Sequence, residues 1–238
     1  MALTYTQYVN SLANLMSVPS DDANLAVDLP NIIDDAELRI YRELDLLDTS
    51  VRDASGSLTA GNRNFNLPSA SGTFVVTGEF NVITPASATT ADGGTRNQLV
   101  PTSNEVLNAL WPSVSGSTVP QYFSMVNQGL IIVGPWPDAA YRIEVVGTIR
   151  PPALSSTNVT TLLSTYWPDL LMAASMVRAA GYQKNYGQGI DDPKMAITWE
   201  THYQELVKGA DVEEMRKKFT SEGWSSDDPA KLATPPRT

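Results

Sequence analysis

The strongest constraint on the fold is a hydrophobic period that changes twice along the chain. In residues 1–50 apolar side chains recur at three- and four-residue steps, as in helices, whereas residues 51–154 contain short alternating runs between turn residues, as in strands. The helical period then returns, directly after the sequence "IRPP". Pro151 and Pro152 cannot donate ladder hydrogen bonds, so they end the last strand. Because amphipathic helices must bury their apolar stripes, the N- and C-terminal helices are expected to pack together. We therefore predict an α+β fold, a helical bundle with an inserted β-rich domain that is sandwich-like or barrel-like.

Two helices are predicted before the strands. In "TYTQYVNSLANLM" the apolar stripe consists of Tyr5, Tyr8, Leu12, Leu15 and Met16. In "LPNIIDDAELRIYRELDLL" the shared face consists of Ile33, Ala36, Ile40, Leu44 and Leu47. Pro30 suits the first turn of this second helix, which would place Asp34, Asp35 and Glu37 near its positive end.

The middle segment predicts several short strands. They are expected in "NRNFNLP", "GTFVVTGEFNVITP", "QYFSMVNQGLIIVGPWP" and "YRIEVVGTI", with a hairpin turn at residues 127–129. A short helix is predicted in "SNEVLNALW" with Ser103 as its N-cap. The small polar residues of "ASATTADGGTRN" indicate a surface loop or hairpin tip.

Two helices and a tail are predicted after Pro151 and Pro152. Pro168 and Asp169 suit the start of the first, whose face would contain Leu170, Ala174, Val177 and Gly181, with Leu171 beside them. Asp191, Asp192 and Pro193 suit the start of the second, whose buried face would contain Ala196, Trp199, Tyr203, Leu206 and Ala210. After Phe219 the pattern stops, and the remainder is expected to be an extended tail that a lone monomer leaves mobile. The predicted domains are therefore 1–50 and 155–218 for the bundle, 51–154 for the β insertion and 219–238 for the tail.

The chain is acidic, and the acidity is concentrated in one part. Its net charge is −10, of which residues 1–50, with nine acids and two arginines, supply −7. Such a surface repels DNA phosphates, which disfavours the usual modes of DNA binding; it equally fits a solvated helix face. There is no cysteine, no apolar run of the length a membrane span needs and no recognisable secretory signal, so neither disulfides nor membrane insertion is expected.

Catalytic motifs are lacking. His202 is the single histidine, and an ordinary helix-surface residue is the favoured interpretation over a catalytic or metal-binding one. Four acid pairs could suggest acid–base or metal chemistry, but helix-start and turn preferences explain most of them more simply: Asp21-Asp22, Asp34-Asp35, Asp191-Asp192 and Asp227-Asp228. We expect no enzyme activity, no metal and no cofactor.

A basic run, Arg216, Lys217 and Lys218, lies at the end of the last predicted helix. One interpretation is that these residues complement the helix dipole. The other joins them to Phe219 and Trp224 as a peptide with a basic start and an aromatic anchor, suited to a groove of another protein.

Four stretches carry a resemblance to a known family. They are "LPNIIDDAELRIYRELDLL", "GTIRPPALSSTN", "YWPDLLMAASMVRAAGYQKN" and "WETHYQELVKGA". Over roughly residues 1–215 the chain resembles the head-to-tail adaptor (connector) proteins of short-tailed and related phages. The resemblance implies a homo-oligomeric ring, usually twelve-fold, beneath the portal protein in the virion, made in the host cytoplasm and located at the head–tail junction.

The resemblance also implies a division of roles. The bundle would surround the channel through which the genome passes without specific binding, and the β insertion would face tail nozzle or tail fibre proteins. The C-terminal segment would reach the portal, which makes Arg216, Lys217, Lys218, Phe219 and Trp224 portal-docking candidates. The acidic candidates for the channel wall are Asp34, Asp35, Glu37, Glu43 and Asp45.

Two other functions remain open from the sequence. The first is a more distal tail or baseplate component whose β module binds fibres or glycans. The second is a carbohydrate-active hydrolase that uses a carboxylate pair, although no motif indicates a substrate.

Overall fold

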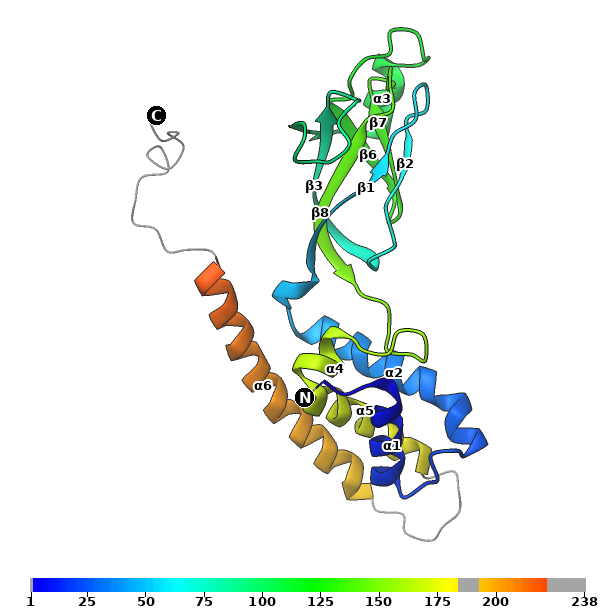
Figure 1. Cartoon of the computed structure of the whole chain (residues 1–238), viewed down its shortest axis with the longest axis vertical. Coiled ribbons are helices and arrows are strands. Elements are labelled where there is room, and N and C mark those ends of the chain that lie inside the picture. Colours follow the sequence, from blue (N-terminus) through cyan, green and yellow to red (C-terminus); the bar gives the residue numbers. More distant parts are fainter. Residues whose placement is uncertain (1, 184–192, 222–238) are drawn as a thin grey trace. The chain divides into compact units, whose positions relative to one another are not determined.

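The chain forms two compact units. The computed structural model describes residues 2–183 and 193–221. One unit comprises Met1–Leu47 together with Ala153–Thr238, and the other comprises Asp48–Pro152. The first contains helices and the second contains the strands with one short helix (Figure 1). The predicted α+β fold, a β-rich insertion between two helical ends, is confirmed.

The helical unit is organised around one helix. Its helices are α1 (Tyr5–Met16), α2 (Ala23–Glu43), α4 (Leu162–Tyr166), α5 (Pro168–Gln183) and α6 (Pro193–Ser221). Helix α5 contacts each of the other four. Helix α5 carries small residues, and Ala173, Ala174 and Ala179 are buried, which lets neighbouring helices approach closely. The N- and C-terminal helices therefore share one apolar core, as their stripes predicted.

Helix α1 follows its predicted stripe with one exception. Thr4 caps it in a capping box with Gln7, and Tyr8, Leu12 and Met16 are buried. Leu15 is exposed, so its placement on the buried stripe was wrong; Ala13 is buried instead. Ala13 and Leu15 are two positions apart and therefore about 200° apart around the helix, so the buried face extends from Leu12 to the Ala13 side and not to the Leu15 side.

Helix α2 begins earlier than predicted, so Pro30 lies inside it rather than in its first turn. The Asp22 carboxylate accepts hydrogen bonds from the backbone nitrogens of Asn24 and Leu25, both at 2.9 Å, and so caps the true start. The extra turns bury Leu25 and Leu29, and Pro30 itself faces solvent. This burial explains why the helix continues through a residue that lacks a backbone donor.

The inserted unit is a β sandwich. Its strands are β1 (Ser50–Ser57), β2 (Asn64–Asn66), β3 (Thr73–Thr84), β4 (Thr95–Gln98), β5 (Val100–Pro101), β6 (Tyr122–Asn127), β7 (Leu130–Gly134) and β8 (Arg142–Arg150). One sheet has the order β1-β8-β3-β4 and the other β2-β7-β6-β5. All pairs are antiparallel except β5 with β6. One hydrophobic cluster joins both sheets, and the Phe80 and Phe123 rings meet across it with centroids 4.6 Å apart.

Several local predictions in the two units are confirmed. Strands β6 and β7 form the hairpin at residues 127–129, and Ser103 caps helix α3 (Asn104–Leu110) by accepting from the backbone nitrogen of Val106. Strand β8 ends at Arg150, directly before the two prolines. Helices α5 and α6 begin at Pro168 and Pro193 as predicted.

Other elements were missed because they lack an apolar pattern. Strand β1, "SVRDASGS", has no alternation of large apolar side chains and forms through its pairing with β8. Strand β4 lies within the predicted loop and is ordered by its pairing with β3. Strand β5 and the five-residue helix α4 are too short for a periodic signal. Leu47 belongs to a short 3-10 helix, η1 (Leu47–Thr49), rather than to α2.

Candidate functional site

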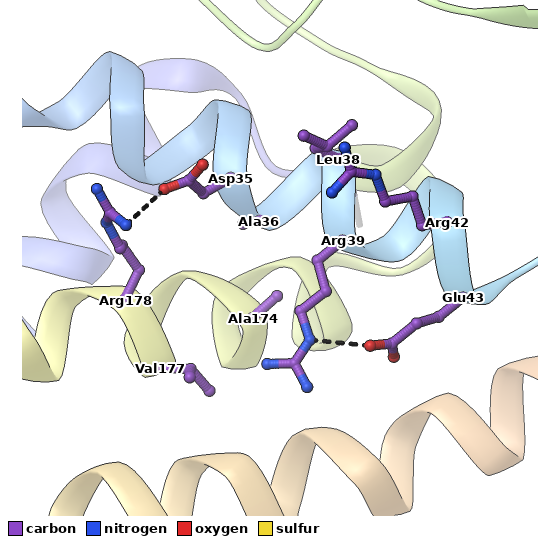
Figure 2. A pocket seen from close by; sticks show the side chains of 9 residues that line it. All are labelled: Asp35, Ala36, Leu38, Arg39, Arg42, Glu43, Ala174, Val177 and Arg178. Atoms are coloured by element: carbon purple, nitrogen blue, oxygen red, sulfur yellow. Dashed lines mark hydrogen bonds and ion pairs between the residues drawn. The ribbon is translucent and has the colours of Figure 1, made fainter. Parts of the chain in front are cut away.

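An open groove of about 670 Å³ runs between α2 and α5 in the helical unit. Small side chains, Ala36 and Ala174, lie between the two helices, while longer side chains line the sides. Figure 2 shows the ion pair of Asp35 with Arg178 at one end and that of Arg39 with Glu43 at the other. The groove is therefore polar at its rim on a unit whose N-terminal part is strongly acidic.

At the Arg39 end of the groove, a network of hydrogen bonds connects α2 to α6. The Arg39 guanidinium donates to both carboxylate oxygens of Glu200, at 2.5 and 2.7 Å, and to Glu43 at 3.1 Å. It also lies 4.0 Å from the centroid of the Tyr203 ring, whose hydroxyl donates to Glu43 at 2.8 Å. The bidentate hydrogen bonds from Arg39 to Glu200 lower the pKa of Glu200 to about 2. The same hydrogen bonds raise the pKa of Arg39. Burial, together with Glu43, raises the pKa of Tyr203.

Arg42 differs from the other two arginines of the groove. Arg178 pairs with Asp35 at 2.9 Å and Arg39 pairs with two glutamates, but Arg42 has no ion pair among the residues that the structure describes. A guanidinium in this position can bind a carboxylate or phosphate of a partner.

The five acidic candidates have different environments. Asp34 is exposed and makes no ion pair within the described part of the chain, while Asp35 and Glu43 pair with arginines. Asp45 pairs with Lys218 at the far end of α6. Because α2 starts at Ala23, Asp34, Asp35 and Glu37 lie well past its first turn, so the helix dipole does not account for them.

Glu37 cannot belong to a channel wall formed by exposed side chains of this chain. Only 3% of it is exposed, and its carboxylate accepts hydrogen bonds from the Leu154 backbone nitrogen at 3.2 Å and from Thr161 Oγ1 at 3.5 Å. Burial raises the pKa of Glu37 to about 7. Glu37 lies on the same face of α2 as buried Ile33 and Ile40, so its side chain points inward. The pattern of charged residues in the sequence did not indicate this.

The basic run at the end of α6 is engaged within the bundle. Lys217 pairs with Glu214 at 2.7 Å and Glu213 at 3.1 Å, and its ammonium lies 4.3 Å from the Trp167 ring centroid. Buried Glu214 in turn accepts from the backbone nitrogen of Leu47 at 2.8 Å. Arg216 is exposed. Helix α6 continues to Ser221, three residues into the predicted tail. Trp224 and the remainder of the tail lie outside the described residues, as do Asp191 and Asp192.

The remaining single-residue candidate in the described part of the chain is the one histidine. His202 is exposed on α6 and meets the Trp199 ring edge-on at 6.0 Å. Among the described residues, no group of three His, Asp or Glu side chains is placed to hold a metal ion. None of the helices in residues 2–183 and 193–221 has the length and apolar character needed to cross a membrane.

Sequence reasoning missed the Arg39–Glu200–Tyr203 network and the role of Glu214. Arg39 and Glu200 are 161 residues apart, so no local pattern relates them. The Tyr203 position was predicted as buried, but its hydrogen bond to Glu43 requires the packing of α6 beside α2.

Comparison with known families agrees with this architecture. The model of the family described as "SU10 adaptor protein" matches residues 3–223, which includes both the helical unit and the β sandwich. The chain therefore belongs to the SU10 adaptor protein family, a family of phage head-to-tail adaptors, and the resemblance seen in the sequence is confirmed. The comparison with curated proteins gave no match.

Proposed function

We propose that this protein is a structural component of the virion that forms a ring between portal and tail and lines the channel through which DNA leaves. The observation that carries the proposal is the family match, because it spans nearly all of the chain and both structural units. An adaptor needs one part for assembly and another for different partners, and two separately folded units supply them.

The acidic bundle suits a channel wall. A surface of negative side chains repels DNA phosphates and lets the genome slide without sticking. Asp34 is the best candidate, since it is exposed on α2 and makes no ion pair with a described residue. Asp35 is also exposed on α2, but it is paired with Arg178. Glu43 and Asp45 are already paired with Arg39 and Lys218, and Glu37 is excluded from the proposal by its burial.

Portal docking is proposed for the end of α6 and the residues that follow. Phe219 and Trp224 would supply aromatic anchors, while Arg216, exposed on α6, would supply charge. Lys217 and Lys218 could bind the portal only by exchanging their contacts with Glu214 and Asp45 for contacts with the portal. We expect a chain that ends at Lys218 to lose portal binding; normal ring formation by that chain would exclude the docking role of the segment.

The first experiment is to mix the purified protein with its cognate portal ring and to image the mixture by electron microscopy. A second ring of density on the outer end of the portal would support the adaptor role. A bare portal at micromolar protein would favour a more distal tail component whose β unit binds fibres or glycans. A monomer in solution without portal would not decide between them, because the portal can present the surface on which the ring assembles.

The proposed role is non-catalytic. Membership in a family of structural adaptors supports it. A screen against glycans, esters and nucleic acids is expected to show no turnover, and reproducible turnover that a point substitution abolishes would contradict this part of the proposal.

A further inference from the structure

The β sandwich has one flank on which two strand edges are incompletely paired. Strand β4 pairs with β3 only at residues 81–84, and β5 pairs with β6 only at Tyr122 and Phe123. Within the described part of the chain, residues 73–79 of β3 and 124–127 of β6 therefore have no strand on their outer side. We name these two segments the open flank.

The open flank exposes apolar side chains at two of its three β-bulges, the third of which is at Gly78. Val75 is the extra residue in β3 opposite β8, and Val126 is the extra residue in β6 opposite β7. Together with Val76 and Met125 they are between 45% and 59% exposed. A bulge re-aims side chains, which explains why adjacent residues of one strand are both exposed.

Two contacts hold the segments side by side. The Thr77 hydroxyl donates to the Met125 sulfur at 3.6 Å, and the Gln128 side-chain amide donates to the Phe74 carbonyl oxygen at 3.1 Å. The four exposed apolar side chains thus lie on the same side of the sandwich, next to the two unpaired edges.

The open flank has β-bulges, which are one of the usual protections of a sheet edge, but it lacks the others. Free edges normally carry lysines, prolines or inward-pointing charges that prevent strand addition. Residues 73–79 and 124–127 contain one ionisable side chain, Glu79, which makes no ion pair with any described residue. An unpaired edge beside an apolar patch is a site for β-strand addition by another chain.

We propose that the open flank binds the opposite flank of a second copy of this chain, which is formed by β1 and β2, so that neighbouring sandwiches continue each other's sheets around the ring. The inference rests on the ring stated under Proposed function. Such a contact joins two different surfaces of one chain, which is the kind of interface that closes into a ring.

The two flanks match in length and direction. Strand β1 has eight residues and faces an open stretch of seven in β3, whereas β2 has three and faces four in β6. Strands β1 and β3 both run antiparallel to β8, and β2 and β6 both run antiparallel to β7, so each matched pair is parallel. Neighbours in a large ring are related by a small rotation, comparable with the twist of about 20–25° between adjacent strands, so that direction is preserved.

The charges of the two flanks are also complementary. On the opposite flank the Arg52 side chain is 60% exposed and reaches Glu144 only at 3.7 Å, while Arg96 already pairs with Glu144 at 2.9 Å. Arg52 and Glu79 both pair with Val146 of β8, which follows core residue Val145, so both side chains are on the outer face of their sheet. A contact between Arg52 of one copy and Glu79 of the next would help to set the register more than it would add affinity.

The test uses the absence of cysteine from the chain. In the parallel register that places Arg52 beside Glu79, Val76 lies beside Ser50 of the next copy, because Gly78 is an extra residue in β3. The double variant Val76→Cys with Ser50→Cys is assembled on the portal, treated with a short bismaleimide and run on a denaturing gel. We expect a ladder of covalent multimers, with Val51→Cys or Arg52→Cys in place of Ser50→Cys to scan the register. Each single variant, and the control pair Val76→Cys with Leu110→Cys, should remain monomeric.

The outcomes separate this inference from the proposed function. A ring on the portal without a ladder from any pair would overturn the flank contact and leave the adaptor role intact, whereas absence of the ring would overturn both. Crosslinking of single Val76→Cys to a tail protein in complete particles would show a different occupant and overturn the proposal.

A substitution gives a second, independent measurement. Val76→Asp should leave the circular dichroism of the free chain unchanged, because Val76 is exposed, but should weaken ring assembly at least tenfold. Val114→Asp, at an equally exposed valine outside the flank, is the matched control and should assemble normally. Wild-type assembly by Val76→Asp would contradict the proposal.

Discussion

The carboxylate of Glu37 accepts a hydrogen bond at 3.2 Å from the backbone nitrogen of Leu154. Leu154 is the second residue of the helical unit after the chain leaves the β sandwich through Pro151 and Pro152, and its side chain is buried in the bundle core. A buried carboxyl on α2 therefore fixes the position at which the chain re-enters the bundle.

The stability of the bundle should depend on the protonation of Glu37. Its pKa is about 7 in the folded chain and near the ordinary value of 4.5 when unfolded, so the folded state binds the proton more tightly. Its contribution is complete below about pH 4.5 and is lost as pH rises through 7. Relative to wild type, Glu37→Gln should become more stable between pH 5 and 8, by about 2–3 kcal/mol over that range.

The measurement is urea unfolding at several pH values, followed by the helical circular dichroism signal, because α3 is the one helix of the sandwich among the described residues. The exposed carboxyl variant Glu205→Gln is the control and should show the wild-type pH dependence. A constant difference between wild type and Glu37→Gln at all pH values would show that Glu37 does not titrate in this range.

The Arg39–Glu200 pair should stabilise the packing of α6 beside α2. Because the Glu200 side chain is 39% exposed, screening reduces the effect, and a double-mutant cycle with Arg39→Met and Glu200→Gln should give a coupling of about 1 kcal/mol. The pKa of Glu200 is lowered to about 2, so its contribution is present above about pH 4.5 and is lost as pH falls toward 2. A coupling unaffected by salt or by this pH change would argue against an ionic interaction.

Gly147 should be essential to the pairing of β3 with β8. A Cβ at this position would overlap the Val76 carbonyl oxygen and approach the Thr77 Cα to 3.1 Å. Gly147→Ala should therefore destabilise the sandwich by more than about 2 kcal/mol, since the obstacle is backbone rather than a flexible side chain. Gly129→Ala, where the nearest atom is 3.9 Å away, is the control, and thermal unfolding followed in the β-sheet signal compares the two.

Gly209 offers a prediction of the opposite sign. It lies within α6, and a Cβ there would meet no atom within 4 Å. Gly209→Ala should raise the stability of the helical unit by about 0.5–1 kcal/mol, because alanine loses less backbone entropy in a helix. An unchanged or lower melting temperature would indicate that the end of α6 is already frayed at this point.

The fold class and most helices could be predicted because burial along one face leaves a periodic trace in the sequence. Tyr8, Leu12 and Met16 on α1, and Leu170 and Ala174 on α5, are examples in which the local pattern and the final burial agree. The hairpin before Leu130 and the cap at Ser103 were predictable for a similar reason, since turn and cap chemistry involve residues within a few positions of one another.

Tertiary structure decided the features that depend on distant partners. Strand β1 is ordered by β8, some ninety residues later in the chain, and not by its own polar sequence. The acids of α2 look equivalent in the sequence, yet packing buries Glu37 against Leu154, pairs Asp35 with Arg178 and leaves Asp34 exposed. Periodicity records which side of an element is buried, whereas the partner of each charge and the edge left open on each sheet follow from contacts between segments far apart in the chain.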